Sequence, residues 1–587
     1  MEYQIDIFNQ MLIFAIFALS LNLLLGYAGQ ISVAHAGLGA AGGYAVGYLA
    51  VKHGTPYIEA SIVGIAAATI LGTAVSFPAL RLTQVFVILL TLAFSTVFLT
   101  LIVGLPYFGG SYGLVGVTGV NFFGANLIQP SDWLKLLLPI AAVVFVLCWR
   151  LGESPFGRVL KGIREDEIAT RSLGKDIFLY KIGIFALTSA LAGLAGVALV
   201  YYNQLASPSQ FSFSAVTTMI AMVIIGGMGN LVGSLIGVFL VVVSGPFLEK
   251  QVHASADHAS LIRLIIYGAA LIVVMRLRPE GILPEGASFQ GASASVRRLL
   301  RRAPSPEEPA PSRPPAVPLA PSTRAPGSTN GIAELPAVVE VKGLAKRFGG
   351  IHAVDGLDFR LPTGKITGLV GPNGAGKTTV FNLITGAIRP DAGVVLLNGV
   401  DITNLEPHRV ARKGMVRSFQ DVRLLPRLSV LDNVCLAVPD QPGERLGPLF
   451  FRPMLSTRAE RRVKEKAREA LRFVGMEHRV NVPAGSLGYG EQKLVALARM
   501  LATEASVLLL DEPASGIDRG WLEPILDVVL QARDMGKTIC LVEHNLHIVE
   551  RLADWVYFME AGAVTAQGSM ADLVKQPRLA EVYFGNA

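Results

Sequence analysis

Nine long apolar stretches, all before about Arg278, constrain the fold of this chain more than any other feature. The chain is 52% hydrophobic and 16% charged, and the apolar excess lies almost entirely in that first part. A helix needs about 20 apolar residues to cross the hydrocarbon core of a bilayer, so these stretches predict a polytopic α-helical membrane domain with about eight to ten spans. The candidate spans are residues 8–27, 31–51, 57–77, 84–103, 134–151, 182–202, 215–228, 231–248 and 261–275.

The distribution of charge between these stretches predicts their orientation. The loop from Arg150 to Lys181 is rich in basic residues, which the positive-inside rule places in the cytoplasm. Residues 104–132 carry almost no charge and suit an outer face that receives a small substrate. Counting spans then places the N-terminus outside. The stretch 215–228 is short and ends in glycine, so a broken or re-entrant helix is an alternative to a full span there.

A second kind of domain is predicted by residues 371–378, which read GPNGAGKT between an apolar stretch at 366–370 and a helical pattern. The three glycines let successive backbone N–H groups face an anion, and the following helix adds its positive N-terminal end. Lys377 is then placed to reach the β- and γ-phosphates, and Thr378 to hold Mg²⁺. A chance glycine-rich turn is the alternative when such a motif stands alone. Between an apolar stretch and a helical pattern, the motif at 371–378 instead indicates a nucleotide-binding loop.

Residues 507–510 form a short apolar run that ends in Asp511 and Glu512. A fully buried parallel strand delivers such carboxylates to the carboxyl edge of its sheet. We expect Asp511 to bind Mg²⁺ through water and Glu512 to act as general base for the attacking water. A solvated strand end is the alternative interpretation, which the phosphate-binding loop disfavours.

Three further features identify the family: Gln420 within RSFQDVRLLP, the run LGYGEQ at residues 487–492, and His544 within LVEHNLHIV. Together they resemble an ABC-type ATPase, an α/β P-loop domain that hydrolyses ATP with Mg²⁺. The resemblance implies that Phe348 stacks on adenine, that Gln420 links Mg²⁺ to the membrane domain, and that His544 contacts the γ-phosphate. It also implies that the 487–492 signature completes the site of a partner subunit, so two ATPase domains meet head to tail.

The residues implied by these motifs form four sets. The catalytic set is Glu512 and His544. The ATP-binding set is Phe348, Gly371, Asn373, Gly374, Gly376, Lys377, Thr378, Thr379 and Gln420, and the Mg²⁺ ligands are Thr378, Gln420 and Asp511. The signature set is Gly488, Tyr489, Gly490, Glu491 and Gln492.

Gly488 departs from the family pattern, which usually has serine at this position. The change removes a hydroxyl donor to the γ-phosphate of the partner's ATP, while the backbone N–H groups of Gly488 and Gly490 are expected to remain available. Losing one donor to developing charge costs about 10²–10³ in rate. We therefore expect a working but slower site.

Both parts of the chain resemble subunits of branched-chain amino-acid ABC importers. Residues 10–285 resemble the permease subunit through ALSLNLLLGYAGQISVAHAG, FPALRL, GGSYGLVGV, SPFGRVLKGIREDEIATRSLG and GGMGNLVGSLIG. NGVDITNLEPHRVARKGMVRSFQ and STRAERRVKEKAREALRFVGM resemble the ATP-binding subunit. Related permeases carry urea, other amides or organic acids, including aromatic acids.

The predicted domains are a transmembrane permease at 1–286, a linker at 287–336 and a cytoplasmic ATP-binding domain at 337–587. The linker is rich in Pro, Ala and Ser and is expected to be a disordered tether. The basic run at 297–302 is expected to lie against membrane lipid. The alternating charges at 456–476 predict a solvated helix. We therefore expect no nucleic-acid partner.

Glycines recur every fourth residue at 39, 43 and 47 and again at 229, 233 and 237. Such smooth helix faces favour close helix packing, and the alternative is that glycine-rich segments expose backbone along a substrate pathway. His35 is an ionisable side chain within a span, which makes it a candidate for function or a structural histidine. The candidate pathway residues are Gln30, Ser32, His35 and Asn230.

The loop from Phe156 to Asp176 is the expected mechanical link between the domains. Its apolar and charged residues alternate at helical spacing, which predicts a short amphipathic helix that docks on a cytoplasmic surface. By resemblance to ABC importers it would insert near Gln420. A plain connecting loop is the alternative. The candidate coupling residues are Arg158, Gly162, Glu165 and Gly174.

The sequence as a whole therefore predicts a fused permease and ATPase of an ABC importer in a bacterial inner membrane, with its ATPase domain in the cytoplasm. One chain supplies one permease and one ATPase. The expected partners are a second permease, a second ATPase and a periplasmic solute-binding protein, in a hetero-oligomer or a homodimer. An ABC exporter and a non-transporting ABC regulator are the alternatives, disfavoured by the number of spans and by Glu512 and His544.

Overall fold

The computed structural model describes residues 2–80, 82, 84–117, 120–122, 125–252, 256–285 and 335–575. The described residues divide into two compact units. The first contains the chain up to Arg164 and resumes at Phe178, whereas Glu165–Ile177 belongs to the second unit, together with the C-terminal part of the chain. The sequence-based boundaries place 165–177 in the first domain, and the contacts place it in the second. Most of the predicted linker and the basic run at 297–302 lie outside the described residues.

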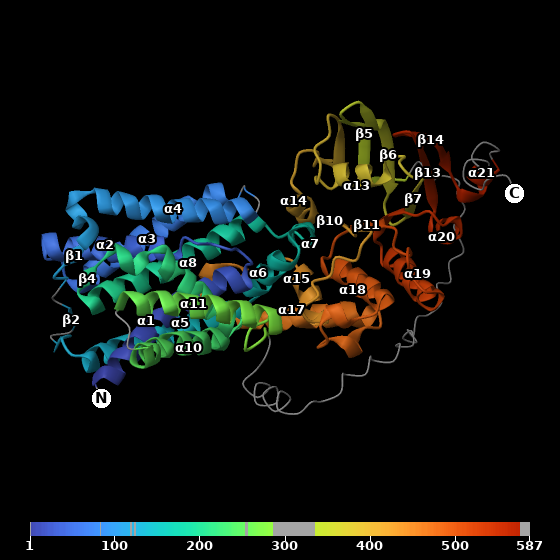
Figure 1. Cartoon of the computed structure of the whole chain (residues 1–587). Helices are drawn as coiled ribbons and strands as arrows, with labels where there is room; N and C mark the ends of the chain where they lie inside the picture. Colours follow the sequence, from blue (N-terminus) through green and yellow to red (C-terminus); the bar gives the residue numbers. More distant parts are fainter. Residues whose placement is uncertain are drawn as a thin grey trace. The chain divides into compact units, whose positions relative to one another are not determined.

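The first unit is built from helices (Figure 1). Its long helices run side by side in one bundle, and short strands and 3₁₀ turns connect them. The helices are α1 (Glu2–Asn22), which continues as the π-helix η1 (Leu23–Tyr27), α2 (His35–His53), α3 (Tyr57–Ala79), α4 (Gln84–Gly104), α5 (Pro130–Gly152), α6 (Pro155–Glu165), α8 (Ile177–Asn203), α9 (Phe213–Gly226), α10 (Leu231–Val252) and α11 (Ala256–Leu277). The shorter pieces are η2 (Pro106–Phe108), η3 (Gly110–Tyr112), η4 (Pro208–Phe211), β1 (Leu114–Val115), β2 (Asn121–Phe122), β3 (Ala125–Asn126) and β4 (Leu205–Ala206).

Each predicted apolar stretch coincides with one of these helices. Within the described residues, five helices are long and apolar enough to cross a membrane: Glu2–Tyr27, Tyr57–Ala79, Gln84–Gly104, Pro130–Gly152 and Ile177–Asn203. Shorter apolar helices lie at Phe213–Gly226, Leu231–Ser244 and Gly268–Leu277. The first unit is therefore a helical permease-like bundle, and the predicted eight to ten crossings exceed the five helices that meet both criteria.

Helix α1 lies in the interior of this bundle. It packs against α5, α9 and α10, and its side chains from Ala15 to Asn22 are buried. By contrast, α3 and α4 expose rows of large apolar side chains, among them Ile62, Ile70 and Val85. Such exposed apolar rows suit the hydrocarbon of a bilayer.

The second unit combines two β-sheets with helices. The mixed sheet contains β7 (Ile366–Val370), β10 (Met415–Arg417), β11 (Val507–Asp511), β12 (Thr538–Val542), β13 (Trp555–Glu560) and β14 (Ala563–Gly568). The antiparallel sheet contains β5 (Ala337–Phe348), β6 (Ile351–Pro362), β8 (Ala392–Leu397) and β9 (Val400–Asp401). The helices are α7 (Glu167–Ser172), α13 (Lys377–Ile384), α14 (Pro407–Arg412), α15 (Val430–Ala437), α16 (Leu446–Phe451), α17 (Pro453–Phe473), α18 (Tyr489–Ala502), α19 (Arg519–Asp534), α20 (Leu546–Leu552) and α21 (Met570–Val574); short 3₁₀ turns include η6 (Pro442–Glu444) and η7 (Glu477–Arg479).

The order of strands in the mixed sheet is β10-β11-β12-β7-β13-β14. All neighbouring strands except β13 and β14 run parallel, and every residue of β7, β11 and β12 is buried. Such apolar runs form central strands because both faces of the sheet are covered. The glycine-rich loop follows β7 and the acidic pair ends β11, so both lie at the carboxyl edge, where open α/β sheets bind ligands.

Candidate functional site

The glycine-rich loop has a backbone that other residues cannot easily replace. Gly371, Gly374 and Gly376 have φ values of 155°, 82° and 100°, all in the region that favours glycine. A Cβ atom on Gly371 would lie 2.0 Å from the Met559 carbonyl oxygen, and one on Gly376 would lie 2.2 Å from the Ala353 carbonyl oxygen. The loop therefore wraps closely against β6 and β13 and leads directly into α13, as a phosphate-binding loop requires.

Lys377 begins α13 and is buried, and its Nζ atom donates to the carbonyl oxygens of Gly371 at 2.8 Å and Pro372 at 2.9 Å. Burial lowers the pKa of Lys377, while the nearby Glu512 and Asp511 oppose the shift. The amine therefore lies over the loop, in position to bind a phosphate held there. Neighbouring positions are open, since Asn373, Gly374 and Thr378 are exposed and Thr379 is partly buried.

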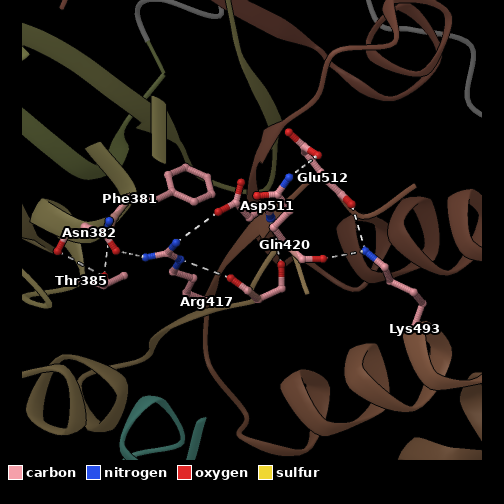
Figure 2. A network of polar contacts seen from close by, with 9 residues as sticks. Phe381, Asn382, Thr385, Arg417, Gln420, Lys493, Asp511 and Glu512 are labelled. Carbon is pink, nitrogen blue, oxygen red and sulfur yellow. Dashed lines mark hydrogen bonds and ion pairs between the residues drawn. The ribbon is translucent and has the colours of Figure 1, made fainter. Parts of the chain in front are cut away.

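Asp511 ends β11 and is held by Arg417 from β10 (Figure 2). The Arg417 Nη2 atom lies 3.1 Å from the Asp511 Oδ2 atom, and both side chains are almost fully buried. Burial raises the pKa of Asp511, and the Arg417 guanidinium opposes that shift. Arg417 also donates to the Oδ1 atom of Asn382 in α13. The guanidinium therefore connects the end of β11 to the helix that follows the loop.

Glu512 lies just beyond β11 with a φ of 47°, a value uncommon for a residue with a side chain. Its Oε2 atom accepts a hydrogen bond from the Nε2 atom of Gln420 at 3.1 Å, and its Oε1 atom contacts the Nε2 atom of His544. Three predicted residues from distant parts of the chain thus meet at one carboxylate. The arrangement presents a carboxylate that can orient and deprotonate water.

The sequence interpretation missed Arg417 and Lys493. Lys493 is buried, and its Nζ atom donates to the carbonyl oxygens of Glu512 at 3.0 Å and Gln420 at 3.3 Å (Figure 2). It thereby fixes the backbone on either side of the Gln420–Glu512 pair. One signal was present: Arg417 is the first residue of the motif RSFQDVRLLP, and Lys493 directly follows LGYGEQ. A lysine is rarely buried without a partner.

The signature residues lie at the start of α18. Gly488 is the N-cap, and its backbone N–H donates to the Glu491 Oε2 atom at 3.0 Å. Gly490 packs so tightly that a Cβ atom there would lie 2.4 Å from Trp521. Tyr489 is partly exposed, and Gln492 donates from Nε2 to the Leu487 carbonyl oxygen at 2.9 Å. We expected the Gly488 N–H to be available to a partner's ATP. In the structure it instead donates to Glu491 within the cap of α18.

Phe348 ends β5 and is about half exposed, at the hairpin that leads into β6. Ala353 of β6 lies against Gly376, so the hairpin adjoins the phosphate loop. The predicted Mg²⁺ ligands suit a hard cation, because Thr378, Gln420 and Asp511 offer hydroxyl, amide and carboxylate oxygens. Gln420 uses Nε2 in its bond to Glu512, which leaves Oε1 free to face a cation.

The predicted coupling residues fall into two groups. Glu165 accepts a hydrogen bond from the Arg427 backbone N–H at 3.1 Å, and the Gly174 carbonyl oxygen accepts one from Arg412 Nε at 2.8 Å. Arg158 and Gly162 are buried in α6 of the first unit. The segment also differs from the expected single amphipathic helix, since α6 and α7 are separate and only α7 belongs to the ATPase-containing unit. Asp166 caps α7 by accepting from the Ala169 N–H, which starts a new helix there.

The candidate pathway residues have different surroundings. Asn230 donates to the Pro284 carbonyl oxygen at 3.0 Å, and its own carbonyl oxygen accepts from Asn22. Ser32 accepts from the Ala34 N–H at 3.2 Å, and the Gln30 N–H donates to the Leu24 carbonyl oxygen at 2.9 Å. His35 is fully buried, and neither ring nitrogen has a hydrogen-bond partner among the described residues.

Comparison with known proteins identifies a permease part and an ATPase part, and the permease match includes residues 165–177. Residues 3–275 match the family described as the permease component of branched-chain amino acid transport systems, and residues 354–515 match the ABC transporter family. The high-affinity branched-chain amino acid transport ATP-binding protein BraF of Pseudomonas aeruginosa is 34% identical over 251 residues, which cover 43% of this chain and 98% of BraF. The probable branched-chain amino acid transport ATP-binding protein LivG of Archaeoglobus fulgidus is 35% identical over 248 residues, which cover 42% and 95%. A crystal structure of a nucleotide-free ATP-binding cassette from an ABC transporter is 32% identical, with 43% of this chain and 100% of that chain covered and a TM-score of 0.38.

Proposed function

Because this chain belongs to the branched-chain amino acid ABC transporter family, as a permease domain fused to an ATP-binding domain, we propose that it couples ATP hydrolysis to uptake of branched-chain amino acids or similarly small polar solutes. The observation that carries the proposal is the convergence of Gln420 and His544 on the Glu512 carboxylate, beside the phosphate-binding loop. A domain used only for binding has no need of a positioned base.

The catalytic step follows from this arrangement. The N–H groups of the loop and Lys377 hold the phosphates, and Glu512 orients and deprotonates the attacking water. Mg²⁺, held by Thr378, Gln420 and Asp511, would neutralise charge on the β- and γ-phosphates. Both Glu512 oxygens are engaged, by Gln420 and His544, so a change at the Glu512 carboxylate reaches Gln420 directly.

The proposed setting is a bacterial inner membrane, with the ATPase domain in the cytoplasm. The proposed complex contains two permease domains and two ATPase domains, with the second pair from separate subunits or from another copy, and a periplasmic solute-binding protein. The apolar faces of α3 and α4 contact lipid. Urea, other amides and organic acids are the alternative solutes, and a panel of loaded binding proteins distinguishes them.

We predict that Glu512→Gln retains ATP binding and abolishes turnover, because an amide keeps the shape of the side chain and cannot accept a proton. ATP hydrolysis and nucleotide binding by the reconstituted chain are the measurements. A loss of about 10²-fold or more is expected for removal of a general base. Glu550→Gln on α20 is the matched control, since it makes the same chemical change at an exposed site. Hydrolysis by Glu512→Gln at the rate of the unchanged chain would contradict the assignment.

A further inference from the structure

The segment Glu165–Ile177 is held within the ATPase-containing unit by charged contacts at both of its ends. At the N-terminal end the contacts made by the segment are acidic. The Asp166 Oδ2 atom lies 3.0 Å from Arg423 Nη1, and Glu165 accepts from the backbone N–H of Arg427 at 3.1 Å. Arg423 follows Gln420 closely in the chain, so the acidic end of the segment lies at the loop that contacts Glu512.

At the C-terminal end the most deeply buried contact has the opposite polarity, because Lys175 of the segment supplies the cation. The neighbouring Asp176 lies 3.6 Å from the His408 Nε2 atom. Lys175 is 3% exposed and forms an ion pair with Glu444, which is 10% exposed and ends η6. Its Nζ atom also donates to the Val438 carbonyl oxygen at 3.3 Å. Gln441 donates to that same oxygen at 2.8 Å. Lys175 is therefore inserted into a closed polar site formed by the residues after α15.

Between these ends, one face of the segment is buried at Ala169, Thr170 and Leu173, and the other face borders a cavity. A cavity of about 300 Å³ lies beside α7, with Ile168 and Arg171 of α7 on one side and Thr385, Met415 and Phe419 on the other. Helix α7 has only six residues, too few to be stable as an isolated helix. The middle of the segment is therefore held by burial of one face, and its two charged ends add contacts that depend on the direction of the segment.

We propose that these two ends form a polarity code that sets which ATPase surface the segment accepts and in which orientation it docks. The code is an acidic N-terminal end at Asp166, facing Arg423, and a cationic C-terminal end at Lys175, facing Glu444. Reversing the segment would place Asp166 beside Glu444 and Lys175 beside Arg423, so like charges would meet. The fitting partner is an ATPase domain with a cation at the first position and a carboxylate at the second.

The more deeply buried pair, Lys175 and Glu444, contributes most of the binding energy of the two charged ends. Removing one member of a buried ion pair leaves an uncompensated charge in a site with little water, which is strongly unfavourable. The two pairs also select the partner surface. A surface that placed a like charge opposite Asp166 or Lys175 would bind less well, because like charges across an interface repel each other. The Asp166–Arg423 pair is more exposed, at 21% and 35%, and contributes orientation more than attachment.

The test exchanges the charges of the buried pair in the full-length chain, reconstituted in lipid nanodiscs. Lys175→Glu and Glu444→Lys are made singly and together, and amide hydrogen exchange is followed across residues 165–177. Each single variant is expected to raise exchange of this segment by about tenfold or more, and the double variant is expected to restore protection. Lys175→Gln is the milder variant, with a smaller rise. Thermal unfolding of each protein shows whether the ATPase-containing unit remains folded.

The control is Arg472→Glu with Glu477→Arg, which reverses an exposed pair 2.8 Å apart in the same unit. It should leave exchange at residues 165–177 unchanged. Unchanged exchange in both single variants would overturn the proposal, and so would a folded double variant that stays unprotected. Hydrogen exchange needs no transported solute, so this result stands apart from the proposed function. If the chain transported no solute, the proposed function would be refuted. The hydrogen-exchange results would still test the proposed role of the two charged ends.

Discussion

Gly488 stands where the resemblance to ABC-type ATPases implies a serine, and its backbone is not strained. Its φ is −63°, and a Cβ atom there would meet only the Glu491 Oε2 atom, at 3.7 Å. The fold therefore does not require glycine at this position, unlike Gly490, where Trp521 leaves no room. The missing hydroxyl is a chemical feature of the site, and the Gly488 N–H is already bonded to Glu491.

Gly488→Ser is predicted to raise ATP hydrolysis by about tenfold or more, since one donor to developing phosphate charge is worth up to about 10²–10³ in rate. The measurement is the maximal rate of ATP hydrolysis by the assembled transporter. Gly447→Ser is the control, because a side chain at Gly447 meets nothing within 4 Å. An unchanged rate would show that the missing hydroxyl does not limit turnover.

The residues that the sequence placed correctly beside one another are those fixed by short motifs. The loop at 371–378 follows β7 and leads into α13, and the acidic pair ends β11. Gln420, His544 and Glu512 then meet in space, as their motifs imply. Arg417 was missed because its contact with Asp511 arises from the register of β10 against β11, which pairs Arg417 with Leu509. Such long-range pairing leaves no local pattern to read.

At the level of helices, the recurring glycines let two backbones approach closely. A Cβ atom on Gly196 of α8 would lie 2.0 Å from the carbonyl oxygen of Gly39 in α2. Similarly, a Cβ atom on Gly237 of α10 would lie 1.9 Å from the Met222 carbonyl oxygen in α9. These contacts favour the packing interpretation over an exposed pathway for those positions, as small residues do in membrane helix pairs.

Gly196→Ala is predicted to destabilise the first unit, because the added methyl group must push two helix backbones apart. Overpacking of this kind costs about 1–3 kcal/mol. The measurement is thermal unfolding of the purified chain in detergent, where the transition of the helical unit should fall. Gly268→Ala on α11 serves as control, since nothing lies within 4 Å of that position. Equal stability of the two variants would contradict close α2–α8 contact.

Periodicity predicted the helices well and their boundaries less well. Each apolar stretch became a helix because a long apolar segment has few other ways to satisfy its backbone in lipid. The pattern at 156–176 was taken as one helix, yet Asp166 caps a second one, and the contacts divide the segment between units. That division depends on which surface buries each turn, which hydrophobic spacing alone does not specify.

At the level of the whole chain, the described part of the first unit ends close to the start of the segment Glu165–Ile177. Glu285, the last described residue of that unit, forms an ion pair with Arg164 at 2.7 Å, and Arg164 directly precedes Glu165. The last described residue before the linker therefore lies beside the residue that precedes the segment Glu165–Ile177. Lys161 adds a second cation, 3.5 Å from the same carboxylate.

The central claim is that ATP hydrolysis drives solute uptake through this chain. The most direct test is accumulation of radiolabelled leucine in proteoliposomes that contain the assembled transporter, with loaded binding protein on the receiving side and ATP on the other. The account predicts concentrative uptake that requires ATP and disappears in Glu512→Gln. No leucine, isoleucine or valine uptake above the Glu512→Gln background, with ATP hydrolysis intact, would contradict branched-chain amino acids as its substrates.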